Sequence, residues 1–163
     1  MEPESTAASR LLVLTTRLEL ALLAHCRAAY PDEACGALLG RIEGSVRLVD
    51  EIVPLVNDTT GDRRDRFAVR PADLLELMRR ERETGARVIG FFHSHPDDPP
   101  RPSETDRCAA WPEYSYPIVS VSSSGAASWA SWRLNEAGDE YERETIRIVP
   151  NSSEYPSAHE VPS

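Results

Sequence analysis

Two histidines separated by one residue, His93 and His95, directly follow the apolar run of residues 87–92. Residues i and i+2 of a strand point to the same face, so both imidazoles can bind one ion at Zn–N distances of about 2.0–2.1 Å. Asp106 offers a third ligand, because it lies three residues after Ser103 and shares its face of the helix expected there. Two imidazoles and one carboxylate leave one position of a tetrahedral zinc ion open, which is typical of catalytic sites. The spacing therefore predicts a catalytic Zn²⁺ site.

A hydrolytic zinc site also needs a side chain that accepts and returns a proton. Glu33 is the best candidate, because it is an acid placed directly before the apolar run that begins at Ala34. The neighbouring Asp32 is the alternative. Ser103 is expected to cap the helix that follows it, and this role is compatible with a catalytic contact.

This combination of residues resembles the JAMM (MPN-plus) zinc metallopeptidases. The signature of that family is an upstream Glu in an E-x-C-G-x-L-x-G-like strand, followed by an H-x-H-P…S-x-x-D run. The chain contains every residue of this pattern: Glu33, Cys35, Gly36, Leu38, Gly40, His93, His95, Pro96, Ser103 and Asp106. The resemblance implies an α/β fold with a mixed central sheet packed by helices and a cytidine-deaminase-like architecture.

The same resemblance implies roles for the residues. His93, His95 and Asp106 would bind zinc, Glu33 would act as general base and then as acid, and Ser103 would stabilise the oxyanion. Members of the family cleave bonds after the C-terminal glycines of ubiquitin and ubiquitin-like proteins, and short bacterial-type members resemble hydrolases of sulfur-carrier proteins. The expected reaction is cleavage of the peptide or isopeptide bond after the C-terminal Gly-Gly of such a carrier, releasing an amino acid or an extension.

Two other functions remain open at this point. One is removal of a ubiquitin-like modifier from lysines of target proteins. The other is a non-catalytic MPN scaffold, which the complete ligand set disfavours. The sequence does not decide whether the chain forms a homodimer.

A polar loop at residues 57–66 contains the run GDRRDR. Arg63 and Arg64 make it locally basic, so it can attract an acidic carrier protein and position its tail, although a simple solvated loop has the same composition. Asn57 and Phe67 flank the loop and are expected to line the substrate groove. The extended tail is expected to add beside an exposed edge of the sheet.

Composition excludes several classes of function. The 163 residues include 18 basic ones, all of them Arg, against 27 acidic ones, giving a net charge of −9. Nucleic acid binding is therefore not expected, since it depends on many cationic contacts. Three cysteines without a C-x-x-C pair indicate a reducing, cytoplasmic setting, and neither a signal peptide nor a membrane-spanning segment is expected.

The order of elements predicts one domain over residues 10–149, with disordered tails at 1–9 and 150–163. A helix is expected from Thr16, with Glu19 completing a capping box, to Tyr30-Pro31. Two further helices are expected from Pro71 to residue 84 and at 103–110. Strands are expected at 10–14, 34–41, 45–53, 67–69, 87–92, 117–122, 127–134 and 141–149. The continuous apolar run at 87–92 indicates a central strand.

Overall fold

Seven strands and three helices form the part of the chain that the computed structural model describes, residues 10–64 and 68–151. The strands are β1 (Leu11–Thr15), β2 (Cys35–Glu43), β3 (Val46–Leu55), β4 (Arg87–Pro96), β5 (Tyr116–Val121), β6 (Ala127–Leu134) and β7 (Tyr141–Val149). The helices are α1 (Thr16–Ala29), α2 (Pro71–Thr84) and α3 (Glu104–Ala109). The expected alternation of strands and helices is confirmed.

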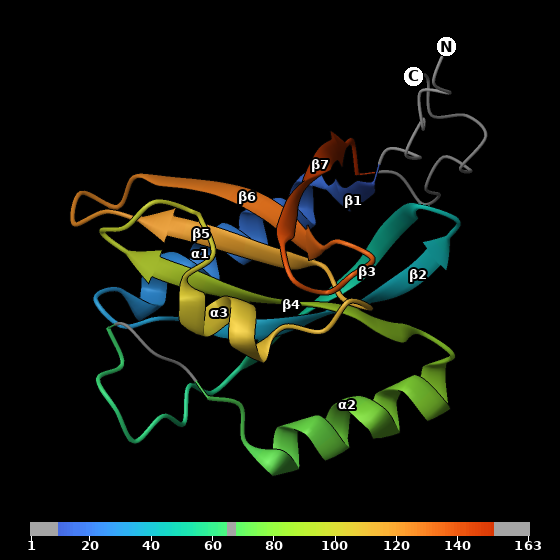
Figure 1. Cartoon of the computed structure of the whole chain (residues 1–163), viewed down its shortest axis with the longest axis horizontal. Coiled ribbons are helices and arrows are strands. Elements are labelled where there is room, and N and C mark those ends of the chain that lie inside the picture. Colours follow the sequence, from blue (N-terminus) through green and yellow to red (C-terminus); the bar gives the residue numbers. More distant parts are fainter. Residues whose placement is uncertain (1–9, 65–67, 152–163) are drawn as a thin grey trace.

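The strands form one sheet of mixed direction in the order β1-β3-β2-β4-β5-β6-β7 (Figure 1). Three pairs are parallel, namely β1 with β3, β1 with β7, and β4 with β5, and the other pairs are antiparallel. β4 lies between β2 and β5, as its apolar sequence predicts. The sheet closes into a barrel because β1 pairs with β7 as well as with β3. Closure is partial, because β1 pairs with only the first three residues of β3, so the expected addition of a substrate tail beside an exposed sheet edge stays a prediction.

The two long helices cover opposite faces of the sheet. Leu22 of α1 packs in one core cluster with Leu38 of β2, whereas Leu77 of α2 packs in another with Ala37 and Leu39 of the same strand. Successive side chains of a strand point to opposite faces, so this alternation places one helix on each side. In Figure 1, α1 lies behind the sheet and α2 lies below it.

Local sequence signals set most boundaries. Pro71 occupies the first turn of α2, and Gly85 ends that helix in the left-handed conformation with φ 73°. The N-cap of α1 is Thr15 rather than Thr16, and its side chain accepts a hydrogen bond from Leu18 N. The strand predicted at 67–69 is wrong for residues 68 and 69, which belong to no helix or strand. Residue 67 lies outside the described residues.

The chain ends lie mostly outside the described residues. Residues 1–9 and 152–163 lie outside the described part of the chain, so the disordered tails stay predictions. Asn151 is described, and its side chain accepts a hydrogen bond from Arg17 N at 2.8 Å. Among residues 10–64 and 68–151, no helix is long and apolar enough to cross a membrane.

Candidate active site

His93 and His95 lie on the same face of β4, as their spacing predicts, and both are almost fully buried. Their Nε2 atoms are 3.0 Å apart. Asp106 of α3 meets them, with Oδ1 3.2 Å from Nε2 of His93 and Oδ2 3.3 Å from Nε2 of His95. The three side chains therefore offer three ligand atoms to one point.

The start of α3 fixes the Asp106 carboxylate. Ser103 is the N-cap, and its Oγ accepts a hydrogen bond from Asp106 N at 3.1 Å. In return, Ser103 N donates to Asp106 Oδ2 at 2.7 Å, which completes a capping box. The Tyr141 hydroxyl of β7 donates to the Asp106 main-chain oxygen at 3.2 Å. The ligand is thus oriented from its own helix and from a distant strand.

The donor set fits zinc. Ligand atoms about 2.0–2.1 Å from a tetrahedral zinc ion are roughly 3.3 Å from one another. The two Nε2 atoms are 3.0 Å apart, and the Asp106 carboxylate approaches them through different oxygens, Oδ1 at 3.2 Å and Oδ2 at 3.3 Å, which are similar separations. With three protein ligands, a fourth position stays open for a water molecule or a substrate oxygen.

Charges at the site support cation binding. Burial lowers the pKa of His93, so this imidazole stays neutral and able to coordinate. Burial opposes ionisation of Asp106, but its contacts with His93 and His95 outweigh it and hold the pKa of the carboxyl far below its usual range. Burial also lowers the pKa of His95, yet its contacts with Asp106 and with a main-chain oxygen raise it overall. A neutral His93 and an ionised carboxylate are thus available to a cation, whereas His95 must lose a proton to coordinate one.

The ring of His95 is oriented by the loop that follows it. Its Nδ1 lies 2.9 Å from the main-chain oxygen of Pro99. A carbonyl oxygen only accepts, so Nδ1 carries the proton and Nε2 keeps its lone pair for a metal. The neighbouring oxygen of Pro100 accepts a hydrogen bond from Trp132 Nε1 at 3.0 Å, which ties this loop to β6.

Asp97 holds the other end of the same loop. It is the only described non-glycine residue with a positive φ, 59°. Its carboxylate accepts hydrogen bonds from the Tyr30 hydroxyl at 2.6 Å and from Ser123 N at 3.1 Å. Its main-chain N donates to Val121 O at 2.8 Å. These bonds connect the loop after His95 to the end of α1 and to the β5–β6 turn.

Glu33 comes to the site from the segment before β2. The residue is 6% exposed, and Cys35, two residues later, pairs with His93 across β2 and β4. Its main-chain N donates to Arg63 O at 2.6 Å, and its main-chain O accepts from Asn57 Nδ2 at 3.1 Å. Asn57 Oδ1 in turn accepts from Ala68 N at 3.1 Å. The loop between β3 and α2 therefore positions the acid.

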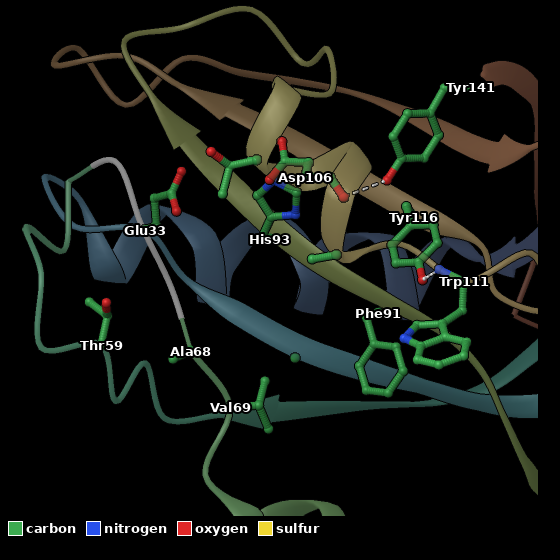
Figure 2. Close-up of a pocket in the computed structure, with 13 residues that line it drawn as sticks. Glu33, Thr59, Ala68, Val69, Phe91, His93, Asp106, Trp111, Tyr116 and Tyr141 are labelled. Atoms are coloured by element: carbon green, nitrogen blue, oxygen red, sulfur yellow. Dashed lines mark hydrogen bonds and ion pairs between the residues drawn. The ribbon is translucent and has the colours of Figure 1, made fainter. Parts of the chain in front are cut away.

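A cavity of about 350 Å³ opens beside these residues (Figure 2). Glu33, His93 and Asp106 lie together at one end of it, with Thr59 nearby. Its other lining residues are Gly36, Ala68, Val69, Phe91, Thr105, Ala109, Trp111, Tyr116 and Tyr141. The predicted acid and two of the predicted ligands thus face one space that can hold a substrate.

Comparison with known proteins decides the family. The family described as prokaryotic homologs of the JAB domain, Prok-JAB, matches residues 15–135. The chain belongs to this family. The identification made from the sequence motifs is therefore confirmed.

Two relatives of this Prok-JAB chain are named as a desampylase and as a CysO-cysteine peptidase. Desampylase of Haloferax volcanii is 30% identical over 82% of the chain and 98% of its own length. CysO-cysteine peptidase of Mycobacterium tuberculosis is 31% identical over 76% of the chain and 82% of its own length. Both alignments span most of the two proteins compared.

Solved structures of similar proteins share the fold. A solution structure from Desulfitobacterium hafniense superposes with a TM-score of 0.76 at 33% identity, covering 87% of this chain and 95% of that one. A solution structure from Salinibacter ruber gives a TM-score of 0.64 at 33% identity, covering 88% and 94%.

The residues predicted to bind substrate lie in different environments. Asn57 is half-buried and uses its side chain to hold the loop and Glu33. Arg64 is exposed, and its Nε lies 3.7 Å from Asp62 Oδ1. Arg63 is exposed and contributes its main-chain oxygen to Glu33. Phe67 lies outside the described residues.

Sequence reasoning missed the aromatic residues of the cavity. Phe91 had a usable signal, because it precedes His93 by two residues and so shares its face of β4. Trp111, Tyr116 and Tyr141 had none, since they reach the cavity only through the packing of three other segments. The contact of Asn57 with the Glu33 main chain was equally invisible.

Proposed function

We propose that the chain is a zinc-dependent hydrolase that cleaves the peptide or isopeptide bond after the C-terminal glycine of a ubiquitin-like or sulfur-carrier protein. The observation that carries the proposal is the convergence of His93, His95 and Asp106 beside a cavity that Glu33 also lines. The names of the two relatives, desampylase and CysO-cysteine peptidase, agree with this substrate class. The complete donor set and the adjacent acid disfavour a non-catalytic scaffold.

The chain's own residues supply the remaining chemistry. A zinc ion bound there would polarise the scissile carbonyl and acidify a water molecule. Glu33 accepts the proton of the attacking water and later delivers it to the leaving amine. The capping bond uses a lone pair of Ser103 Oγ, so the O–H of Ser103 can donate to the oxyanion.

The exposed loop between β3 and α2 is proposed to meet the carrier. Arg63 and Arg64 lie on it and attract an acidic protein, while Asn57 keeps the loop attached to Glu33. Phe67 is proposed to line the groove. The cytoplasmic location and the deaminase-like architecture expected from the sequence stay predictions.

Hydrolysis of defined conjugates tests the proposal. A carrier ending in Gly-Gly is joined to one amino acid by a peptide bond, or to a lysine side chain by an isopeptide bond, and products are followed by mass spectrometry. We expect the purified protein to contain about one zinc ion per chain and to cleave such a conjugate. Removal of the zinc by a chelator should abolish cleavage. Glu33→Gln should reduce turnover by about 10²–10⁴ and keep the metal. Asp32→Asn, the matched control, should retain turnover. Full activity of Glu33→Gln, or loss only in Asp32→Asn, would overturn the assignment of the base.

A further inference from the structure

A second cavity, of about 370 Å³, lies where β6 ends and where β1 and β3 begin. Among the described residues, it shares no lining residue with the cavity beside the metal-binding residues. Two arginines line it, Arg10 and Arg133, and we call it the arginine cavity. We propose that these two side chains bind a phosphate group, as free phosphate or as a phosphate ester, at a site separate from the metal-binding residues. The inference does not depend on the proposed function.

The Arg133 side chain is largely buried, and its donors are poorly satisfied. It is 16% exposed, and its Nε is buried without a hydrogen-bond partner. Within residues 10–64 and 68–151 its only ion pair is long, with Nη1 3.8 Å from Glu144 Oε1. A separation of this size exceeds hydrogen-bond distance. Because a guanidinium carries five N–H donors and buried donors are normally paired, Arg133 is expected to have a further acceptor.

Glu144 satisfies Arg133 only in part, because both of its oxygens already accept hydrogen bonds. The Ser115 hydroxyl donates to Oε1 at 3.0 Å, and the Ser131 hydroxyl donates to Oε2 at 2.7 Å. Arg47 is 3% exposed, and its Nη1 donates to Ser115 Oγ at 3.1 Å, so a second guanidinium lies beside the same network. Two mostly buried arginines therefore share one buried glutamate, and an anion in the arginine cavity would compensate the excess positive charge.

Arg10 presents a second guanidinium to the arginine cavity. Its Nη1 donates to Leu134 O at 2.9 Å and lies 3.0 Å from Oε2 of the exposed Glu142. Both contacts use Nη1, so Nε and Nη2 can donate to a ligand. Burial lowers the pKa of Arg133, Glu144 opposes this shift, and the positive charge of Arg10 adds to it. The two cavity arginines thus repel each other, and an anion shared by them would replace this repulsion with attraction.

A phosphate group matches these donors. Guanidinium groups bind phosphate through parallel N–H···O bonds, and two of them facing one cavity suit a ligand with several oxygens and two charges. Glu136 also lines the cavity, but it is exposed, so water and salt screen its repulsion of an anion. The volume lies within the range of small-molecule sites and leaves room for a substituent on the phosphate. Both free phosphate and a phosphate ester therefore fit.

A phosphate titration followed by NMR tests the inference. Isotope-labelled, zinc-loaded protein is titrated with inorganic phosphate at constant ionic strength, and the arginine Nε–H signals are recorded together with the main-chain signals. We expect saturable shifts at Arg10, Arg133 and Asn135, with a Kd of about 1 mM or tighter. The absence of shifts at these residues would overturn the inference. Shifts confined to the neighbours of His93 and His95 would also overturn it, because phosphate would then bind the metal instead.

Two further ligands identify the source of the phosphate group. Glycerol phosphate is an ester, and acetate carries one charge and only two oxygens. Tighter binding of glycerol phosphate than of inorganic phosphate supports an organic ester, whereas the reverse order supports the free ion. Acetate should bind at least about tenfold more weakly than either. Equal affinity for acetate would show a general effect of charge and would overturn the inference.

Substitutions locate the binding site. Arg133→Gln removes the buried guanidinium and should weaken phosphate binding by about tenfold or more. Arg10→Gln changes a more exposed side chain and should do the same, so it carries the test if the Arg133 variant fails to fold. Arg17→Gln, at an exposed position of α1, makes the same change of charge and is the matched control. Full affinity in Arg10→Gln, or an equal loss in Arg17→Gln, would overturn the inference.

Discussion

The metal-binding side chains and the acid Glu33 are held in different ways. Hydrogen bonds act on the ligand side chains themselves, at Nδ1 of His95 and at Oδ2 of Asp106. The main chain of Glu33, by contrast, is held by the oxygen of Arg63 and the amide of Asn57. Both of these residues belong to the single loop between β3 and α2. The ligand side chains are therefore fixed by several elements of the barrel, whereas the main chain of the acid is bonded to the exposed loop between β3 and α2.

This difference teaches that metal binding and proton transfer can be disturbed separately. Residues that hydrogen-bond to a metal ligand fix the orientation and tautomer of that ligand, so losing them lowers the affinity for the metal ion. A displaced loop moves the acid and leaves the ligand atoms where they are. Variants on the two sides should therefore separate zinc affinity from turnover.

The largest effect is expected from Asp106→Ala on the metal side. The variant lacks one of three ligands, so zinc affinity should fall by more than the roughly 10–100-fold that loss of an outer partner costs, and hydrolysis should fall with it. Competition with a chromophoric chelator measures the affinity. Asp98→Ala, an exposed acid of the neighbouring loop, is the control. Unchanged affinity in Asp106→Ala would remove the basis of the comparison.

The second largest effect is expected from lowering the pH, which should reduce the affinity of the site for zinc. Protons and zinc compete for Nε2 of His95, whose pKa is raised, while burial keeps the pKa of His93 low. Zinc affinity should thus be highest above the pKa of His95 and fall by about tenfold per pH unit below it. The chelator competition repeated between about pH 7.5 and 5.5 measures this slope. His25→Gln should not change it, and an affinity independent of pH would contradict the expectation.

Asn57→Ala should displace Glu33 and leave the metal-binding residues in place. The substitution removes the hydrogen bond to Glu33 O and the bond from Ala68 N, so kcat should fall about tenfold or more. Zinc affinity should stay within about twofold of the original. Steady-state kinetics and metal competition on one preparation measure both quantities. Asp58→Ala is the neighbouring control. A parallel loss of zinc affinity would show that the two sides are coupled.

Asp97→Ala should give the smallest effect, about a tenfold loss of zinc affinity. It removes the acceptor for Tyr30 and Ser123 and puts alanine at a positive φ, which loosens the loop that orients His95. Asp97→Asn tolerates this conformation and keeps an acceptor, so it should retain most of the affinity. Equal losses in both variants would mean that charge, not loop geometry, is the cause.

Local sequence signals were sufficient for most elements. Pro71 and Gly85 delimit α2 because one has a fixed φ and the other adopts a positive φ without strain. The apolar run at 87–92 indicates a central strand because both faces of β4 are covered. Closure of the sheet could not be predicted in this way, since the pairing of β1 with β7 joins strands at opposite ends of the chain.

The residues of the site also fall into those that local sequence patterns predict and those that only tertiary packing brings together. The sequence by itself was sufficient to predict that His93, His95 and Asp106 come together, because i and i+2 on a strand, and an N-cap at a helix start, are geometric rules of nearest neighbours. Only the tertiary structure decided that Asn57 holds Glu33, that Asp97 supports the loop after His95, and that aromatic rings from four segments share one cavity with the site. Such contacts join residues far apart in the chain, and their positions follow from the packing of the whole barrel.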